Sequence, residues 1–456
     1  MSTITLNDEQ RFALEKVELA YETRVRTGVG AVFQIDGPAG TGKTELIRVL
    51  TERYEDKHIV ICAPTHKACQ VLQERIQSEK NTVTTCHRFL EGYTRYTKNG
   101  QMIWKFKVEV IPVPDLIILD EVSMVDEDVF NAFRYLVQHR MAFVVTTGDR
   151  CQLPPINWTN TPFYIQYPVD ISLTRNMRNQ RVSFNACLEQ LRTYILDPRH
   201  ALARAQEVCE YLATYVPTYT PQWGRVSVQD IPHEILESYA KSTDAIMLAH
   251  RTNLRDNTVE QLNQRLRTFM FGNTEEYVVG DRLIFTDYFK PNGKEQVFHT
   301  NDRATVHQIQ IDSQVFYGET YRTFRMVLIP VQQAHGQVEV HKLHPSDRER
   351  WLMHDQRVQD EIKHTLELKS NLSQSAQDEM WNTYYESKKA IDAPVDYAYC
   401  LSIHKSQGSS YQSVFVFLSD FAWMLYRNAQ DMENRRMFYK LLYVALSRSR
   451  TTACVF

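Results

Sequence analysis

Glycine is scarce in this sequence, because the 456 residues include only 15 glycines, less than half of what an average frequency of roughly 7% would give. Three of the glycines nevertheless fall close together, at Gly37, Gly40 and Gly42. Glycine is the residue that lets a backbone turn sharply or approach a ligand closely. A chain that uses so little of it has concentrated it in one segment, which is therefore the first candidate for a functional loop.

Several other features are absent. No two of the eight cysteines are separated by only two residues, which argues against a zinc ribbon or a thioredoxin-like site and favours reduced, buried thiols in a cytoplasmic protein. The first ten residues contain no apolar signal core, and no apolar run approaches the roughly 18 residues that a membrane span needs. The net charge of -3 excludes a histone-like polycation. It does not exclude nucleic-acid binding, because a basic groove can lie in a balanced chain.

The composition is that of an ordinary globular protein, with 43% hydrophobic and 23% charged residues. Over residues 1–180, short apolar runs alternate with helical spacing such as that of residues 8–22, which predicts an α/β domain with a parallel sheet. The apolar runs are 31–35, 59–63, 116–119 and 143–147. Such runs are typical of strands that are buried on both faces.

One segment interrupts this alternation. Residues 92–110 contain Asn99-Gly100 between two aromatic-rich arms, a pattern that predicts an inserted β-hairpin with a type I′ turn.

The remainder of the chain divides into a second α/β domain and an insertion. Residues 181–275 and 395–456 form the second domain, with a strand at 244–249. Between them, residues 280–345 hold short β-branched and aromatic runs that predict a small antiparallel barrel, and residues 346–390 are polar and helical.

The glycine-rich segment fits the pattern G-x-x-x-x-G-K-[ST] between a predicted strand and a predicted helix. Its residues are Gly37, Pro38, Ala39, Gly40, Thr41, Gly42, Lys43 and Thr44. The glycines allow backbone N–H groups to surround a phosphate chain, and the helix N-terminus adds positive potential. Lys43 is expected to reach the β- and γ-phosphates of the bound nucleotide, and Thr44 to ligate Mg²⁺.

An acidic pair follows the apolar run 116–119. Asp120 stands at the end of a buried strand, where a carboxylate can hold the Mg²⁺ that the phosphate loop implies. The adjacent Glu121 is placed to polarise the attacking water.

Six further motifs follow the phosphate loop in a fixed order. They are APTHKA (63–68), LDEVSM (119–124), GDRCQLPP (148–155), LTRNMR (173–178), SIHKSQG (402–408) and YVALSR (443–448). This series resembles the superfamily 1 helicases, and its order and inserted barrel resemble branch B, the group of the phage Dda helicase and its RecD-like relatives. The resemblance implies two RecA-like P-loop domains with ATP and Mg²⁺ between them, and an SH3-like barrel with a helical extension. It also implies an ATP-dependent DNA helicase that moves 5′ to 3′ in replication, recombination or repair.

The resemblance also assigns nucleotide contacts. Gln10 matches an adenine reader, and Gln152 matches a residue that senses the γ-phosphate. Arg178 and Arg448 match arginines that reach the γ-phosphate from the second domain, although Arg175 is a rival to Arg178. Arginines suit this position because hydrolysis places charge on the transferred oxygens.

DNA contacts are expected in both α/β domains. They are Pro64, Thr65, His66, Thr85 and His87 in the first domain, and Ser402, His404, Lys405 and Ser406 in the second. Hydroxyls and lysine suit phosphates, and proline or imidazole faces suit bases. A lone histidine is more often structural than functional, so that alternative stays open for each histidine.

The hairpin predicts a pin that splits a duplex fork, with Trp104 and Phe106 as the leading candidates for strand separation and Tyr96 and Met102 beside them. The alternative is a hairpin that packs its aromatic residues onto the parent domain. Two roles are open for the barrel and its helices: they could form a clamp that closes over DNA, or a platform that binds a partner protein.

The expected partners are single-stranded and forked DNA, with single-strand-binding and other replication proteins as further candidates. We expect a monomer, in the host cytoplasm if a phage encodes it. Three rival functions remain: a helicase that moves 3′ to 5′, an RNA helicase, and a nucleotide-dependent scaffold without motor activity.

Overall fold

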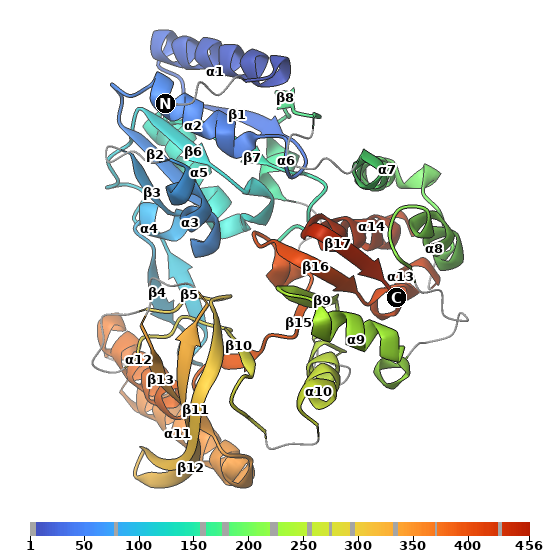
Figure 1. The fold of residues 1–456 in the computed structure, drawn as a ribbon. Helices are drawn as coiled ribbons and strands as arrows, with labels where there is room; N and C mark the ends of the chain where they lie inside the picture. Colours follow the sequence, from blue (N-terminus) through green and yellow to red (C-terminus); the bar gives the residue numbers. More distant parts are fainter. Residues whose placement is uncertain are drawn as a thin grey trace. The chain divides into compact units, whose positions relative to one another are not determined.

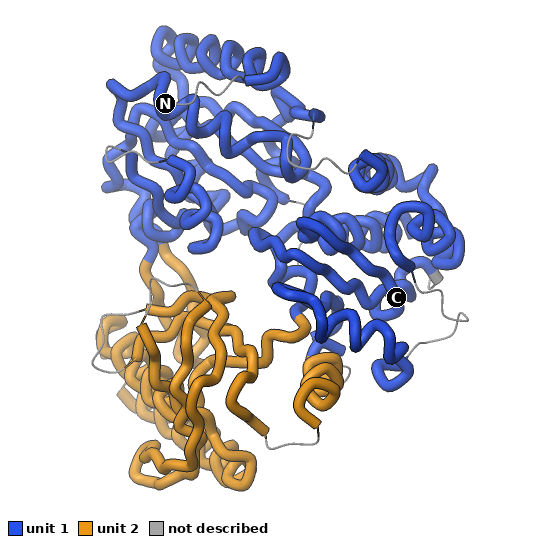
Figure 2. The backbone as a smooth tube through the Cα atoms, in the orientation of Figure 1, with its two compact units in different colours: residues 1–92, 106–259, 401–456 blue, residues 93–105, 260–400 orange. Residues whose placement is uncertain are grey.

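A computed structural model places most of the chain in two compact units (Figure 2). Unit 1 comprises residues 1–92, 106–259 and 401–456, and unit 2 comprises residues 93–105 and 260–400. The residues described are 6–76, 81–155, 161–175, 182–218, 227–252, 258–272, 276–291, 297–331, 336–369, 372–426 and 431–456.

The N-terminal part of unit 1 contains a six-stranded parallel sheet in the order β3-β2-β6-β7-β1-β8 (Figure 1). The strands are β1 (Ala31–Asp36), β2 (Ile59–Ala63), β3 (Thr82–Thr85), β6 (Leu116–Leu119), β7 (Phe143–Gly148) and β8 (Ile171–Ser172). The four apolar runs therefore form strands, as the sequence predicts. β3 was not predicted, because its sequence TVTT lacks a continuous apolar run.

Helices cover both faces of this sheet. They are α1 (Asp8–Thr27), α2 (Lys43–Arg53), α3 (His66–Arg75), α4 (Cys86–Phe89), α5 (Glu127–Arg140) and α6 (Pro162–Gln166). One core joins the first three helices to the sheet, and a second core joins α5 and α6 to the opposite face. Because the strands are buried on both sides, their ends are the places where polar side chains can reach a ligand.

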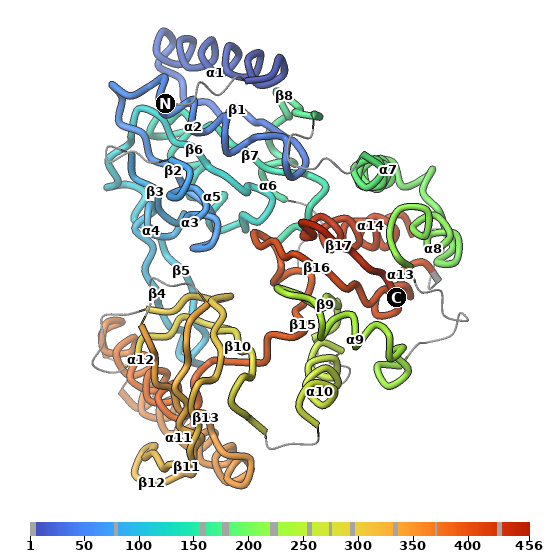
Figure 3. The backbone as a smooth tube through the Cα atoms, viewed as in Figure 1, coloured from blue at the N-terminus to red at the C-terminus, as the bar shows by residue number. Residues whose placement is uncertain are grey.

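A second sheet completes unit 1, in the order β15-β9-β16-β17, and β9, β16 and β17 pair in parallel. Its strands are β9 (Ala245–Ala249), β15 (Cys400–Ser402), β16 (Tyr411–Val416) and β17 (Ser449–Val455). The helices are α7 (Val182–Leu196), α8 (Ala205–Ala213), α9 (His233–Lys241), α13 (Trp423–Tyr426) and α14 (Met432–Ser447). Helix α14 packs against β16, β17 and α7, and the traces of α7 and α14 lie side by side in Figure 3.

Unit 2 contains a five-stranded antiparallel sheet in the order β13-β12-β11-β10-β14. Its elements are α10 (Thr258–Phe271), β10 (Arg282–Phe285), β11 (Arg303–Phe316), β12 (Glu319–Pro330), β13 (Val338–Leu343), α11 (Arg348–Leu368), α12 (Gln374–Ile391) and β14 (Val395–Tyr397). The strands at 280–345 and the helices at 346–390 agree with the sequence prediction. Closure of the sheet into an SH3-like barrel stays a prediction. None of the described helices is long and apolar enough to cross a lipid bilayer.

The border between the units differs from the predicted domain borders. Strand β14 pairs with β10, with Leu283 opposite Tyr397, so the chain stays in unit 2 until Cys400 rather than leaving it before residue 395. At the other border, unit 2 begins at Glu260 inside α10 rather than after residue 275. Pairing between distant strands sets this division, and the local sequence pattern does not reveal it.

The predicted hairpin is present as β4 (Tyr93–Tyr96) and β5 (Met102–Lys105), but its turn is not type I′. Type I′ needs positive φ at both central residues, whereas Gly100 has a φ of 80° and Asn99 is not among the described residues with positive φ. The N–H of Gly100 donates to the carbonyl of Thr97, and the N–H of Thr97 donates to the carbonyl of Gln101, both at 2.9 Å. This pattern belongs to a three-residue loop that ends in a left-handed glycine.

Candidate nucleotide site and nucleic-acid interface

The phosphate loop connects β1 to α2, as the sequence predicts. Gly40 and Gly42 have φ values of 90° and 83°, which L side chains rarely adopt. The ammonium of Lys43 donates to the carbonyl oxygens of Gly37 and Pro38, at 2.6 and 3.0 Å. The loop therefore combines backbone N–H groups at a helix N-terminus with a cation held over them, which is the arrangement that binds a phosphate chain.

Gln10 contacts this loop from α1 and is only 4% exposed. Its side-chain nitrogen lies 3.3 Å from the carbonyl oxygen of Thr41 and 3.4 Å from that of Gly42. Its side-chain oxygen accepts from the N–H of Asn7 at 2.9 Å, which closes the N-terminal cap of α1. Both ends of the amide are thus bonded within the chain, and the adenine-reading role stays a prediction.

The acidic pair lies directly after β6. One carboxylate oxygen of Asp120 accepts from the hydroxyl of Thr147 at 2.5 Å. Glu121 has a φ of 52°, a strained value for a residue other than glycine, and its buried Oε2 has no partner among the described residues. Burial, then the charge of Asp120, raises the pKa of Glu121, while Lys43 and Arg448 oppose the rise. Strain, burial and an unpaired oxygen at one residue indicate a functional carboxylate.

Gln152 lies in the loop after β7. It is 4% exposed, its N–H donates to the carbonyl of Asp149 at 2.9 Å, and its buried Oε1 has no partner among the described residues. Like Glu121, it holds an acceptor ready for a ligand in the same cavity.

A cavity of about 420 Å³ brings most of the predicted nucleotide residues together. From the first part of unit 1 it is lined by Ala39, Gly40, Gly42, Lys43, Thr44, Glu45, Ala68, Val71, Arg75, Asp120, Glu121 and Gln152, and from the second part by Gly408, Ser409, Ser410, Ser447 and Arg448. The guanidinium of Arg448 is held by the hydroxyl of Ser447 at 2.9 Å and the carbonyl of Ser409 at 3.4 Å. Arg178 lies outside the described residues.

The donors in this cavity suit Mg²⁺. Thr44 supplies a hydroxyl and Asp120 a carboxylate, and both line the same space. Mg²⁺ in nucleotide sites takes one or two protein oxygens and completes its shell with phosphates and water. When bound, the ion neutralises charge on the phosphates.

Sequence reasoning missed one wall of the cavity. Ala68, Val71 and Arg75 line it from α3. Their spacing of three and four residues places them on one face of a helix, so the helix that follows APTHKA carried this signal.

Two predicted DNA contacts in the first part of unit 1 serve as helix caps. The hydroxyl of Thr65 accepts from the N–H of Ala68 at 3.2 Å and begins α3, and that of Thr85 accepts from the N–H of Arg88 at 3.3 Å and begins α4. Caps of this kind satisfy N–H groups that a helix leaves free. Pro64 is half-buried and His66 is exposed. Burial lowers the pKa of half-buried His87, so its ring is neutral at pH 7.

The second group of predicted DNA contacts is also largely internal. Ser406 is fully buried and its hydroxyl donates to the carbonyl of Ile403 at 2.7 Å, while the 5% exposed Ser402 accepts from the N–H of Lys405 at 3.3 Å. Burial and the neighbouring His250 lower the pKa of His404 to about 4. The hydroxyl of Ser406 is bonded inside the turn, and its contact with a DNA phosphate stays a prediction. Lys405 is half-buried.

The motifs that carry the predicted DNA contacts in the two parts of unit 1 nevertheless lie next to each other. A side chain at Gly408 would lie 3.9 Å from the hydroxyl oxygen of Thr65. The amide nitrogen of Gln407, which is 6% exposed, donates to the carbonyl of Leu153 at 3.2 Å. Motifs more than 250 residues apart in the chain are thus in direct contact beside the cavity.

The large apolar and aromatic candidates in and beside the hairpin divide into three environments. Tyr96 is buried in the core of unit 2, whereas Trp104 is 37% and Met102 is 50% exposed. Phe106 follows the last hairpin strand and packs against a core of the first sheet. The packing of Phe106 favours the structural alternative for that residue, Trp104 is the more exposed candidate, and the strand-separation role of both stays a prediction.

The hairpin is fastened to α12 within unit 2. Asp378 pairs with the guanidinium of Arg95 at 2.8 Å and accepts from the N–H of Tyr96 at 2.9 Å. The hydroxyl of Tyr385 donates to the carbonyl of Gly100 at 2.8 Å. These contacts fix both the arm and the tip of the hairpin.

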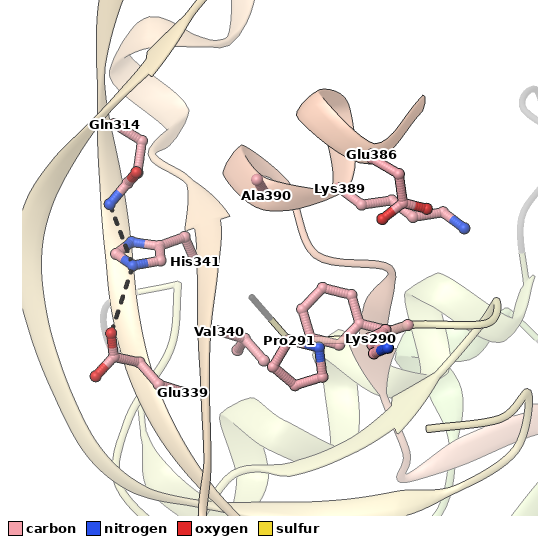
Figure 4. Close-up of a pocket in the computed structure, with 10 residues that line it drawn as sticks. Lys290, Pro291, Gln314, Glu339, Val340, His341, Glu386, Lys389 and Ala390 are labelled. Atoms are coloured by element: carbon pink, nitrogen blue, oxygen red, sulfur yellow. Dashed lines mark hydrogen bonds and ion pairs between the residues drawn. The ribbon is translucent and has the colours of Figure 1, made fainter. Parts of the chain in front are cut away.

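A second cavity, of about 360 Å³, lies between the sheet and α12 in unit 2 (Figure 4). Its described lining residues are Phe289, Lys290, Pro291, Gln314, Glu339, Val340, His341, Glu386, Lys389 and Ala390. His341 bonds to the side chain of Gln314 at 3.2 Å and lies 3.8 Å from the carboxylate of Glu339. Charges of both signs line this cavity, so it does not concentrate positive potential as the phosphate loop does.

Two family models match the chain. An AAA domain matches residues 5–206, and a UvrD-like helicase C-terminal domain matches residues 397–456. Protein R530 of Acanthamoeba polyphaga mimivirus is 21% identical over 486 residues, covering 92% of this chain and 94% of that protein. The ATP-dependent DNA helicase Dda of Enterobacteria phage T4 is 23% identical over 295 residues, covering 61% and 63%. Among solved structures, Pif1 helicase from Bacteroides in complex with ADP-AlF3 and single-stranded DNA is similar at a TM-score of 0.48 and 17% identity, covering 99% of this chain and 92% of that one.

Proposed function

We propose that this chain, which is similar to the DNA helicase Dda and matches a UvrD-like helicase C-terminal domain, is an ATP-dependent DNA helicase that moves 5′ to 3′ along single-stranded DNA and separates the duplex ahead of it. The observation that carries the proposal is a cavity that combines Lys43 and Glu121 from one part of unit 1 with Arg448 from the other. A site assembled from two parts can couple hydrolysis to their relative movement.

Each residue has a defined part in hydrolysis. Lys43 binds the β- and γ-phosphates, and Thr44 and Asp120 hold Mg²⁺. Glu121 accepts a proton from the attacking water, and its raised pKa makes it a better base once it is ionised. Gln152 senses the γ-phosphate, and Arg448 stabilises the charge that develops on the transferred oxygens.

Movement follows from the same geometry. Arg448 and Lys43 line one cavity from the two parts of unit 1, so we expect these parts to close on ATP and to reopen on hydrolysis and release. Alternating grip on the strand by the motifs around His66 and Lys405 converts this cycle into steps. The 5′-to-3′ direction rests on the resemblance to branch B, and replication, recombination and repair are the processes that need such a motor.

Strand separation is the task of the hairpin. Its partly exposed Trp104 and its fastening through Asp378 and Tyr385 support a rigid wedge at the fork. Unit 2 then serves as the support of this wedge and as a clamp beside the strand.

A strand-displacement assay tests the proposal. Duplexes with a 5′ or a 3′ single-stranded tail are offered with ATP and Mg²⁺ to the whole chain and to the variant Lys43→Ala. We expect displacement of the 5′-tailed duplex only, and a loss of about 100-fold or more in the variant, which should still bind oligo-dT.

Four outcomes would contradict parts of the proposal. Displacement of the 3′-tailed duplex alone would overturn the direction. ATP hydrolysis stimulated by RNA and not by DNA would overturn the substrate. Hydrolysis without displacement of either duplex would favour a scaffold, and equal displacement by Lys43→Ala would overturn the nucleotide site.

A further inference from the structure

Two buried carboxylates, those of Asp36 and Asp149, are neighbours in the first sheet, and neither has a part in the proposed hydrolysis. Asp36 ends β1 and Asp149 follows β7, and the parallel register places Asp36 opposite Gly148. Both side chains are fully buried. Burial and the charge of Asp149 raise the pKa of Asp36. Two adjacent buried carboxylates are costly unless a cation compensates them.

Arg150, next to Asp149 in the chain, lies 3.2 Å from the carboxylate of Asp36, and a second compensating cation comes from the second part of unit 1. Arg192 on α7 pairs with Asp149 and lies 3.5 Å from Asp36. The hydroxyl of Tyr443 on α14 donates to the other oxygen of Asp149 at 2.6 Å and lies 3.4 Å from the guanidinium of Arg192. Burial would raise the pKa of Asp149, but Arg192 and its other partners bring it below the ordinary value. Both carboxylate oxygens of Asp149 are therefore held by α7 and α14.

Asp149 in turn shapes the loop that carries Gln152. Its carboxylate accepts from the N–H of Cys151 at 3.0 Å, and its carbonyl accepts from the N–H of Gln152 at 2.9 Å. On the other side, Tyr443 lies on α14 and Arg448 directly follows the last residue of that helix, about 7.5 Å further along its axis. A movement of α14 thus acts on Arg448 directly and on the Gln152 loop through the hydroxyl of Tyr443.

We infer that Tyr443 and Arg192 are positioning residues that make the Gln152 loop follow the closure of α14, so that the γ-phosphate sensor and the arginine arrive together. This inference rests on the proposed function, because it needs a cleft that closes on ATP. A charge-assisted hydrogen bond can transmit the movement of α14 to the loop, because it is stable only over a small range of distances and angles. Breaking it would leave a buried charge unpaired, which is costly.

A conservative pair of variants separates positioning from simple support. Tyr443→Phe removes the hydroxyl that binds Asp149. Tyr439→Phe is the matched control, since Tyr439 is equally buried on α14 and its hydroxyl donates at 2.7 Å to the carbonyl of Leu202. Each variant removes the hydroxyl of a buried tyrosine, and only the hydroxyl of Tyr443 lies between the Gln152 loop and α14.

The measurements are kcat and KM for ATP in the presence of oligo-dT, and the ratio of the oligo-dT Kd values without and with a non-hydrolysable ATP analogue. For Tyr443→Phe we expect kcat to fall about tenfold with KM within about twofold, and the ratio to approach one. Tyr439→Phe should keep both quantities within about twofold of the wild type. Arg192→Lys, which keeps the charge but loses the fork, should lower kcat in the same way.

Two results would overturn the inference. One is that Tyr443→Phe or Arg192→Lys keeps the wild-type kcat and the wild-type ratio of oligo-dT Kd values. The other is that Tyr439→Phe lowers kcat as much as Tyr443→Phe does. A wild-type chain whose ATP hydrolysis is not stimulated by oligo-dT would overturn the proposed function and the inference together. Failure of the inference and failure of the proposed function are distinguishable. The first is seen only in the variants, whereas the second is seen in the unmodified chain.

Discussion

The tip of the hairpin offers a sharp test, through the substitution Gly100→Ala. Gly100 has a φ of 80°, and a Cβ at this position would lie 2.7 Å from the ring of Trp381. Trp381 is fully buried, so its ring has no free space to move into. The substitution should therefore push the hairpin away from α12.

The expected magnitude has two parts. The left-handed backbone costs an alanine about 1–2 kcal/mol, and forcing a methyl group against a packed ring costs about 1–3 kcal/mol more. Gly318→Ala is the matched control, because Gly318 has a φ of 84° but a Cβ added there would meet no atom within 4 Å. The control should show only the backbone part of the cost.

Native-state hydrogen exchange measures the difference. The N–H of Tyr96 donates to Asp378 and becomes free only when the hairpin leaves α12. In Gly100→Ala its exchange should be roughly 5- to 150-fold faster than in Gly318→Ala, which corresponds to the about 1–3 kcal/mol of the ring contact. Unwinding of forked DNA should fall in Gly100→Ala while ATP hydrolysis stimulated by single strands is retained. Equal exchange of Tyr96 in both variants would refute the packing argument, and unwinding at the wild-type rate despite faster exchange would refute the wedge.

Three further predictions concern the cavity and the DNA surface. Glu121→Gln should lower ATP hydrolysis by about 10²- to 10⁴-fold while a fluorescent ATP analogue still binds, and hydrolysis at the wild-type rate would exclude Glu121 as the base. Because burial and His250 lower the pKa of His404 from 6.5 to about 4, its neutral form stabilises the folded chain fully above pH 6.5 and this contribution is lost as the pH falls toward 4. The shift corresponds to about 3 kcal/mol, so urea unfolding of His404→Gln should depend less on pH between 4 and 6.5 than that of the wild type, and identical pH dependence would contradict the burial argument. Trp104→Ala should slow unwinding of forked DNA more than ATP hydrolysis stimulated by single strands, whereas a parallel loss of both would indicate a structural role.

The sequence alone determined the parts of the site that depend on local backbone geometry. Glycines at fixed spacing, a lysine at a helix N-terminus and acids after an apolar strand predict a phosphate loop and candidate metal ligands, because each relation spans only a few residues. The same holds for the order of strands and helices in the first sheet, whose apolar runs are typical of buried parallel strands.

The sequence could not separate residues that share a chemical type. A hydroxyl at Thr65, Thr85 or Ser406 is equally suited to phosphate and to a local backbone group, and in the structure each of the three bonds to a backbone group. Likewise, the sequence predicted the glycine of the hairpin turn correctly. The turn type depended on the φ of Asn99, and the preferences of asparagine allow more than one φ region.

Only the tertiary structure decided the contacts between distant segments. Arg192 belongs to no motif, and its partners Asp36, Asp149 and Tyr443 come from three separate segments. The border of unit 2 at Cys400 depends in the same way on the pairing of β14 with β10. Such contacts depend on how sheets and helices pack, and the free energy of that packing is a sum over many residues that no local pattern encodes.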